Sequence, residues 1–291
     1  MGRTGVGIDI GSTATKVAVV DEAGELLHTA VMPTGFSSVD AAERAREELA
    51  AAGFEVAGRP AGDGAGAPGM GRLARDGSGV VGPRCPQGPV REGGVRVVAT
   101  GYGRVAVPFA DKVVTEITCH GRGAAALFGP DGTVIDVGGQ DTKVIRLRAG
   151  RVVKFAMNDK CAAGTGRFLE VMADRLGVGH DELSALARAG EPTKISSMCT
   201  VFAESEVIGM VGRGEPRANI ARGVIESVVA RVATLAQGSG GSAPYFLTGG
   251  LCDNAFVVER LAAELGSPVG TRGEARYAGA IGAALVAAEL G

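Results

Sequence analysis

The sequence predicts an α/β protein built from two similar lobes that face each other across a cleft. The main reason is an internal repeat: residues 7–17 (GIDIGSTATKV) align with residues 134–144 (VIDVGGQDTKV) at a constant offset of 127 (136 − 9). Each copy continues as an apolar strand, a glycine turn (Gly24 or Gly150) and a further strand, which is the pattern of a β-meander. Strands then alternate with helical patterns, which is typical of the α/β class.

The remaining elements follow from hydrophobic periodicity. Apolar runs predict strands at Val6–Ile10, Val95–Ala99 and Tyr245–Thr248. Helices are predicted in this order: Val39–Ala52, Ile117–Leu127, Arg167–Leu176, Asp181–Ala189, Phe202–Val211, Ile220–Gln237, Asn254–Leu265 and Ala278–Leu290. We expect an N-terminal lobe at residues 1–130 and a C-terminal lobe at residues 131–291.

One segment of the N-terminal lobe has a different composition. Residues 57–94 contain 12 Gly and 5 Pro among 38 residues. Such a segment cannot bury a core, so we expect a flexible surface insertion. Cys85 lies inside it and is not expected to be a structural ligand.

Composition excludes several classes of function. The chain has 291 residues, 45% of them hydrophobic, and its 30 basic and 32 acidic residues give a net charge of −2. Without a basic field, and with 4% aromatic residues and no Trp, nucleic acid is not an expected partner. The chain reaches the strand Val6–Ile10 without a basic and then apolar leader, and its apolar runs are too short to span a membrane. We therefore expect a cytoplasmic protein.

The first copy of the repeat has the design of a phosphate-binding turn. Gly11 allows the backbone to turn sharply after the strand, and successive N–H groups in such a turn form an anion-binding nest. Ser12 and Thr13 add hydroxyl donors, and Lys16 can place a positive charge on a phosphate. The Asp9 carboxylate would repel phosphate, so its predicted task is to hold Mg²⁺ or a water bound to it. The predicted phosphate-binding set here is Gly11, Ser12, Thr13, Ala14, Thr15 and Lys16.

The second copy offers a matching set from the opposite lobe. Asp136 repeats Asp9, Gly138 and Gly139 form the turn, and Gln140 is the candidate to orient an attacking water. With Asp9 and Asp136, Gln140 completes the predicted catalytic set. Later, Thr248, Gly249 and Gly250 follow a strand and would let a nucleoside lie close to the backbone.

Either copy alone is better explained as an ordinary glycine hairpin. Two copies in register, followed by a Thr-Gly-Gly turn, favour a nucleotide site. This pattern resembles the actin-like ATPase superfamily across almost the full chain. The resemblance implies the duplicated actin/sugar-kinase/Hsp70 fold, which is ribonuclease H-like, and ATP as ligand.

Cys161 and Cys199 each precede a predicted helix, for which Gly164 or Thr165 and then Thr200 are the expected caps. A helix N-terminus lowers the pKa of a thiol and favours a negatively charged ligand set. On spacing alone, the pair is better explained as two buried cysteines that pack as small hydrophobic side chains. Two thiolates also leave a [4Fe–4S] cluster two ligands short, so a ligand role requires a second chain.

Residues 158–168 (NDKCAAGTGRF) and 199–206 (CTVFAESE) resemble the two hallmark motifs of the 2-hydroxyacyl-CoA dehydratase activators. The related ATPase subunits of benzoyl-CoA reductase, of the BadF/BadG/BcrA/BcrD type, carry similar motifs. The resemblance implies a homodimer bridged by one [4Fe–4S] cluster, with Cys161 and Cys199 of each copy as ligands. It further implies that a ferredoxin or flavodoxin reduces the cluster. ATP then promotes transfer of one electron to an acyl-CoA dehydratase or reductase.

Three alternatives stay open at this point. The chain is also explained as the ATPase subunit of a benzoyl-CoA reductase-type enzyme. A small-molecule kinase of the same fold, for example for an amino sugar, would need an acidic base and have no use for paired cysteines. A nucleotide-dependent scaffold would bind ATP with little turnover. Among weaker candidates, His120 is expected to be a capping or surface residue beside a buried Cys119.

Overall fold

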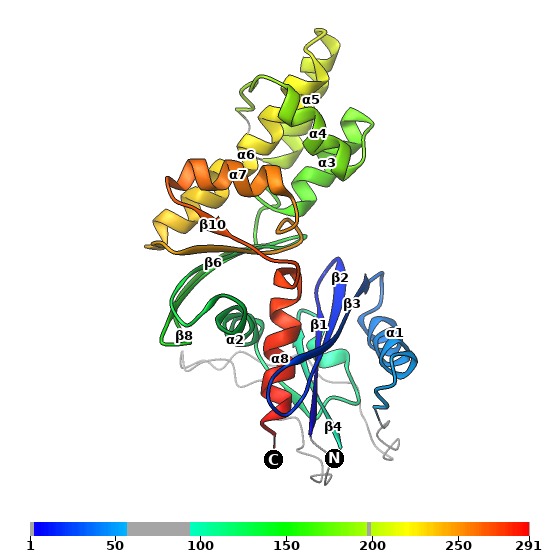
Figure 1. Ribbon diagram of the computed structural model, residues 1–291. Coiled ribbons are helices and arrows are strands. Elements are labelled where there is room, and N and C mark those ends of the chain that lie inside the picture. Colours follow the sequence, from blue (N-terminus) through cyan, green and yellow to red (C-terminus); the bar gives the residue numbers. More distant parts are fainter. Residues whose placement is uncertain (1–2, 57–93, 197–198, 291) are drawn as a thin grey trace, which may run out of the picture.

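The computed structural model describes residues 3–56, 94–196 and 199–290, which form two five-stranded sheets and the helices that cover them (Figure 1). The first sheet has the strand order β3-β2-β1-β4-β5. Its strands β1, β2 and β3 are antiparallel neighbours, whereas β4 and β5 run parallel to β1. Their bounds are β1 Thr4–Ile10, β2 Ala14–Val20, β3 Leu26–Pro33, β4 Val95–Gly101 and β5 Lys112–Val113.

The second sheet repeats this topology in the order β10-β9-β6-β7-β8. The meander β6-β7-β8 is antiparallel, and β9 and β10 are parallel to β6. The bounds are β6 Gly132–Val137, β7 Thr142–Arg148, β8 Arg151–Asn158, β9 Tyr245–Gly249 and β10 Val269–Gly270. Asp9 pairs with Lys16 across the first hairpin and Asp136 with Lys143 across the second, so the predicted repeat is also a repeat of register.

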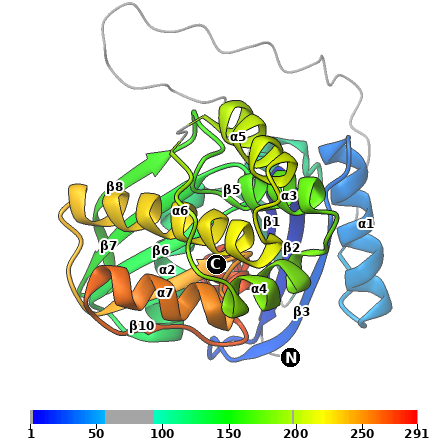
Figure 2. The ribbon, with the colours of Figure 1, turned by 90° about the horizontal axis from the view of Figure 1, so that it is seen from above.

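The predicted helices are present, with ends shifted by a few residues. Their bounds are α1 Ser38–Ala51, α2 Glu116–Phe128, α3 Gly166–Leu176, α4 His180–Ala189, α5 Thr200–Gly212, α6 Arg217–Gly238, α7 Ala255–Leu265 and α8 Ala278–Ala288. Short 3-10 turns occur at η1 Arg104–Ala106 and η2 Ala275–Tyr277. Helices α3 to α7 gather beyond the second sheet, as the two views of the ribbon agree (Figures 1 and 2). Their apolar faces form the larger core with Ile135, Val137 and Val144 of that sheet.

The expected cap of α5 is wrong. Cys199 itself holds the N-cap position, and Thr200 is the first helical residue. At α3, Thr165 is the N-cap residue as predicted, but its hydroxyl donates to the carbonyl of Ala162 instead of accepting from the helix.

Two further expectations concern the glycine- and proline-rich insertion and the absence of membrane-spanning segments. The predicted insertion, apart from Gly94, and Cys85 lie outside the described residues. Within the described residues no helix is both long and apolar enough to span a bilayer. The division of the lobes near residue 130 stays a prediction.

Helices α2 and α8 connect the two sheets. Helix α8 packs against β1, β2 and β4 of the first sheet, while α2 packs against β7 and β8 of the second. The two helices approach each other closely because glycine stands at the contact: a Cβ added to Gly282 would overlap the Cys119 carbonyl oxygen, and one added to Gly123 would overlap the Ala278 carbonyl oxygen. This backbone contact fixes how the sheets sit relative to each other.

The first prediction concerns that contact. Gly282→Ala is expected to lower the free energy of unfolding by about 1–3 kcal/mol or more, because backbone must move to admit one methyl group. Gly238→Ala is the matched control: it is helical, exposed and has no neighbour within 4 Å of an added Cβ. That variant should be unchanged or gain up to about 1 kcal/mol. Denaturant unfolding measures both, and equal effects would contradict the proposed contact.

Candidate functional site

A cavity of about 560 Å³ lies between the two glycine hairpins and extends toward α4 and α7. Much of the predicted nucleotide site lines it: Asp9, Gly11, Ser12, Thr13, Ala14, Lys16, Asp136, Gly138, Gly139 and Gly250. The two turns come together at one end, because a Cβ added to Gly139 would overlap the hydroxyl of Thr13. The repeat therefore brings both predicted phosphate-binding turns to one place.

Four of the predicted residues are not in the lining. Thr15 is buried and its hydroxyl bonds to that of Thr34 at 2.9 Å. Thr248 is buried under the cavity wall, and Gly249 has a positive φ of 82° with no room for a Cβ beside the Val137 carbonyl. Gln140 is exposed on the turn itself. The ligand roles predicted for these residues stay predictions.

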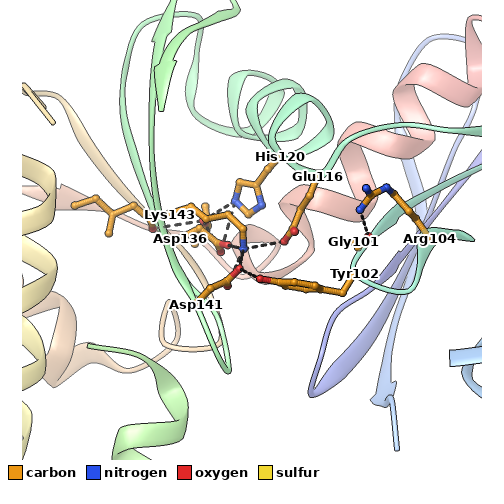
Figure 3. A network of polar contacts seen from close by, with 10 residues as sticks. Gly101, Tyr102, Arg104, Glu116, His120, Asp136, Asp141 and Lys143 are labelled. Atoms are coloured by element: carbon orange, nitrogen blue, oxygen red, sulfur yellow. Dashed lines mark hydrogen bonds and ion pairs between the residues drawn. The ribbon is translucent and has the colours of Figure 1, made fainter. Parts of the chain in front are cut away.

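A buried lysine holds the centre of the site (Figure 3). The Lys143 ammonium lies 2.7 Å from an oxygen of Asp141, 2.9 Å from Glu116 and 3.5 Å from Asp136. Only 2% of its side chain is exposed. Burial favours the neutral amine, but the carboxylates outweigh it and raise the pKa of Lys143, so the side chain is a fixed cation. This cluster joins the second hairpin to α2.

Asp136 is fixed from two further directions. The Thr248 hydroxyl lies 3.2 Å from Asp136 Oδ1, and His120 Nε2 lies 2.7 Å from the same hydroxyl. Burial opposes ionisation of Asp136, but His120, Lys143, Lys16 and the Thr248 hydroxyl bring its pKa down to about 2. Asp136 is therefore an anion at any physiological pH.

The expectation for His120 is wrong, because this residue is only 4% exposed and faces the site. Burial lowers its pKa, and the nearby Asp136 carboxylate acts in the opposite direction. A sequence signal for it exists: His120 lies four residues after Glu116, one helical turn along the same face of α2. Cys119 beside it is buried, as predicted.

Asp9 is the exception in this network. Its Oδ1 is buried and has no hydrogen-bond partner among the residues that the structure describes. Burial is the main cause that raises the pKa of Asp9 above its usual range. Backbone crowds both oxygens, since a Cβ at Gly101 or Gly279 would lie 2.5 Å from one of them. A partnerless buried carboxylate facing a cavity fits the oxygen ligation that Mg²⁺ requires.

Tyr102 crosses from one lobe to the other. It stands in the loop after β4, and its hydroxyl donates to Asp141 Oδ2 at 3.0 Å (Figure 3). Burial and the Asp141 carboxylate raise the pKa of Tyr102 to about 12, so it stays a donor. The sequence alone assigns Tyr102 no role, because the contact depends on how the two lobes pack.

The far end of the cavity has different chemistry. Ser184 and Arg188 of α4 line it, and the Arg188 guanidinium lies 4.8 Å from the ring centre of Phe256. Arg276 pairs with Asp253 at the rim. An aromatic ring and a guanidinium plane can contact a flat base, so this end suits the nucleoside.

The cysteines fall into two groups. Cys119 and Cys252 are buried, and burial raises their pKa values to about 11 and 12, which leaves them as inert thiols. Cys161 and Cys199 are exposed, so the interpretation of this pair as buried packing residues is wrong. Cys161 also lines a second cavity of about 500 Å³ beside α6.

Comparison with known proteins gives a consistent result. The model of the BadF/BadG/BcrA/BcrD ATPase family matches residues 6–287. The activator of lactoyl-CoA dehydratase from Anaerotignum propionicum is 38% identical over 286 residues, which is 98% of this chain and 97% of that protein.

Two solved structures are similar over the whole chain. Component A of (R)-2-hydroxyglutaryl-CoA dehydratase from Acidaminococcus fermentans has a TM-score of 0.81 at 36% identity and covers 98% of both chains. The activator of 2-hydroxyisocaproyl-CoA dehydratase from Clostridium difficile, with bound ADPNP, has a TM-score of 0.79 at 32% identity. It covers 99% of this chain and 95% of its own.

The second prediction tests the buried cation. Lys143→Met is expected to lower the free energy of unfolding by about 3–5 kcal/mol at neutral pH, because three carboxylates lose their partner. Burial already raises the pKa of Glu116 against the opposing Lys143 ammonium, so loss of the ammonium raises that pKa further and the deficit should shrink as the pH falls toward 5. Denaturant unfolding at several pH values measures this. Lys112→Met, at an exposed position, should change stability by less than about 0.5 kcal/mol, and a similar loss in both variants would refute the clustering argument.

Proposed function

The chain belongs to the BadF/BadG/BcrA/BcrD ATPase family, and we propose that it activates a 2-hydroxyacyl-CoA dehydratase by ATP-driven transfer of one electron. The electron passes through a [4Fe–4S] cluster shared between two copies of the chain. ATP occupies the cavity between the hairpins, with its phosphates on the turns at Gly11 and Gly138 and its base toward Phe256.

Two carboxylates are suited to hold Mg²⁺ beside the phosphates. Asp136 is ionised throughout the physiological range, and Asp9 offers an oxygen with no partner in the described part of the chain. The ion, when bound, neutralises phosphate charge. Lys16 faces the same cavity and adds a second positive charge. The protein thus contributes position and electrostatics, which are the main means of catalysis in phosphoryl transfer.

The donor set fits an iron–sulfur cluster completed by a second copy. Cys161 and Cys199 are exposed, and each stands before a helix N-terminus, at α3 and α5. These two helices pack against each other. Two thiolates from each chain give the four that a [4Fe–4S] cluster takes, and the helix dipoles favour its negative charge.

The observation that carries the proposal is a set of short bonds between the phosphate turn and the cysteine segment. The N–H groups of Gly166 and Arg167, at the start of α3, donate to the carbonyls of Gly138 and Gly139 at 2.9 and 2.8 Å. The Thr142 hydroxyl donates to the Gly164 carbonyl at 2.6 Å. A change at the γ-phosphate position therefore reaches the Cys161 loop without an intermediate element.

The same loop is held from its other side. The Asn158 amide donates to the carbonyls of Cys161 and Ala163 at 2.9 and 3.0 Å. Asn158 ends β8, so the loop is tied both to the strand before it and to the phosphate turn. Nucleotide-driven movement of the turn would shift Cys161 as part of one connected unit.

The proposed transfer of one electron determines which protein partners are expected. A ferredoxin or flavodoxin would reduce the cluster, and the acceptor would be an acyl-CoA dehydratase. A benzoyl-CoA reductase-type partner would use the same arrangement of nucleotide and cysteines. An amino sugar kinase or a nucleotide-dependent scaffold would have no use for exposed paired thiols. Membership in an ATPase family favours neither of these two alternative functions.

The third prediction concerns the cluster. Anaerobic purification is expected to yield a brown dimer with about four irons and four sulfides per two chains. Cys161→Ala should lose the iron and the electron transfer but bind ATP with unchanged affinity, because Cys161 lies outside the nucleotide cavity. Cys119→Ala, which removes a buried inert thiol, is the control and should keep its iron. A colourless monomer that turns over ATP with a sugar would sink the proposal.

The fourth prediction concerns coupling. Thr142→Val removes the hydroxyl that bonds to Gly164 and should reduce the effect of ATP on the rate at which a chelator strips iron from the cluster. ATP affinity should stay within about threefold. Thr133→Val removes a similar bond, from Thr133 to the Ser242 carbonyl at the other end of the sheet, and serves as the control. An undiminished ATP effect in Thr142→Val would count against direct transmission through this bond.

A further inference from the structure

We propose that a basic face of the second sheet, beside the Cys161 loop, is the docking surface for an acidic electron-donor protein. The inference rests on the electron transfer proposed above and names the part of this chain that the donor contacts. The surface, called the basic face below, consists of five cations: Arg146 and Arg148 of β7, Arg151 and Lys154 of β8, and Arg231 of α6.

The four cations of the two strands form two like-charged pairs. Arg146 lies directly opposite Lys154, and Arg148 lies directly opposite Arg151. Opposite residues of antiparallel strands point to the same face of a sheet, and like charges in such positions destabilise it. A locally unfavourable pair that occurs twice along one hairpin indicates that these charges have a use other than sheet stability.

The charges of the basic face are crowded and have no counterion. A Cβ added to Gly240, in the loop after α6, would lie 3.5 Å from Arg146 Nη1 and 3.9 Å from Lys154 Nζ, so these two charges share one small region. None of the five cations has an ion pair or hydrogen bond with another of the residues that the structure describes. The basic face is therefore a local excess of positive charge on a chain whose net charge is −2.

Protection of a sheet edge explains only part of this surface. Lys154 lies on β8, the edge strand, where a charged side chain commonly prevents pairing with another chain. Arg146, however, lies on β7, which pairs with β6 on one side and with β8 on the other. Arg231 lies on a helix. Neither arginine is needed to protect the edge, so their presence beside Lys154 requires a separate reason.

The basic face lies next to the Cys161 loop. Arg231 packs on this loop, since a Cβ added to Gly164 would lie 3.2 Å from Arg231 Cβ and 3.6 Å from Arg231 Cδ. Arg231 and Cys161 also line the same cavity of about 500 Å³. Helix α6 contacts β7 and β8 and lies beside them in Figure 2. The helix and the two strands thus present their cations around one end of the cysteine loop.

One partner protein can cover the basic face and the cysteine loop together. Lys154 is four residues before Asn158, whose amide holds the loop, and four residues span about 13 Å along a strand. An electron-transfer interface of about 600 Å² on each partner is roughly 25 Å across. A protein bound to Arg146 and Lys154 therefore reaches the Cys161 loop, where the cluster is proposed.

The chemistry of the basic face favours one kind of occupant. Five cations attract an acidic surface, and complementary charge suits a complex that must form and separate in every reaction cycle. Permanent interfaces between copies of a chain are more hydrophobic, and a twofold axis beside the cysteine loop would bring the same cations together. The occupant is therefore the acidic donor. One electron leaves the reduced donor, which is oxidised, and enters the cluster, which is reduced.

The fifth prediction tests this surface by binding. The probe is an oxidised ferredoxin of strongly acidic composition, and the variant combines Arg146→Gln with Lys154→Gln. Calorimetry at low ionic strength is expected to give a Kd at least about tenfold higher than for the unmodified chain, and the Kd should depend less on salt, because two attractive charges are lost. Thermal unfolding should show equal or higher stability, since the exchange removes a like-charged pair.

The matched control combines Arg3→Gln with Lys112→Gln. It removes the same charge from exposed positions at the first sheet, so its Kd for the ferredoxin should stay within about twofold. Electron transfer gives a second readout. The reduced ferredoxin should reduce the cluster more slowly in the Arg146/Lys154 variant. Reduced methyl viologen, a small cation that needs no acidic docking, should react at an unchanged rate.

Three results would overturn the assignment of the basic face. The first is an unchanged Kd in the Arg146/Lys154 variant, and the second is an equal loss of binding in the control. The third is dissociation of the dimer in that variant, seen by size-exclusion chromatography, which would assign the face to a second copy. Binding of the oxidised ferredoxin needs no electron transfer. A missing cluster would therefore refute the proposed function and leave the docking test valid, whereas unchanged ferredoxin binding leaves the cluster proposal standing.

Discussion

The site depends on one buried ammonium group. Glu116 comes from α2, and Asp136 and Asp141 come from the second hairpin; their negative charges could not be buried together without Lys143 between them. At an effective dielectric constant of about 20, a unit charge pair 4 Å apart contributes about 4 kcal/mol, which offsets a penalty of several kcal/mol for desolvating each ion. The same contacts join the second hairpin to α2, and Tyr102 extends them to the first lobe. The same ion pairs therefore fix the carboxylates beside the cavity and, through the Tyr102 hydrogen bond, connect the two sheets.

The two copies of the repeat share the same strand register, but their lysine side chains have different partners. Lys16 and Lys143 occupy equivalent registers opposite Asp9 and Asp136. At the offset of 127 residues, however, Asp141 corresponds to Ala14. The C-terminal lysine is consequently bound by carboxylates, whereas Lys16 faces the cavity, where it can meet phosphate. Of the three positions at which the two turns differ, Ala14/Asp141 is the one that gives the C-terminal lysine a carboxylate partner.

Sequence alone predicts the parts of this protein that local rules control. Strand ends, glycine turns and helical periodicity gave the elements, and the register of the repeat brought Asp9 and Asp136 to one cavity. Residues whose role depends on the packing of α2 could not be assigned in this way. The spacing of four residues places His120 on the same face of α2 as Glu116. Whether that face points to solvent or to Thr248 depends on the glycine contact between α2 and α8, which lies outside local sequence patterns. Tyr102 is a similar case, since its partner lies 39 residues away in the other lobe.

The proposed nucleotide signal acts between two directly bonded segments, the turn at Gly138 and the Cys161 loop with the start of α3. Gly138 and Gly139 contribute their carbonyls to the first turn of α3, and both glycines also line the cavity proposed for the nucleotide. One peptide segment can therefore bind the nucleotide on one side and the helix on the other. A shift of the turn cannot be absorbed by a flexible linker, because Thr142 and Asn158 hold the Cys161 loop at both ends. Closely packed elements move as rigid units, so a small displacement at the phosphate becomes a reorientation of α3 and of the thiol that precedes it.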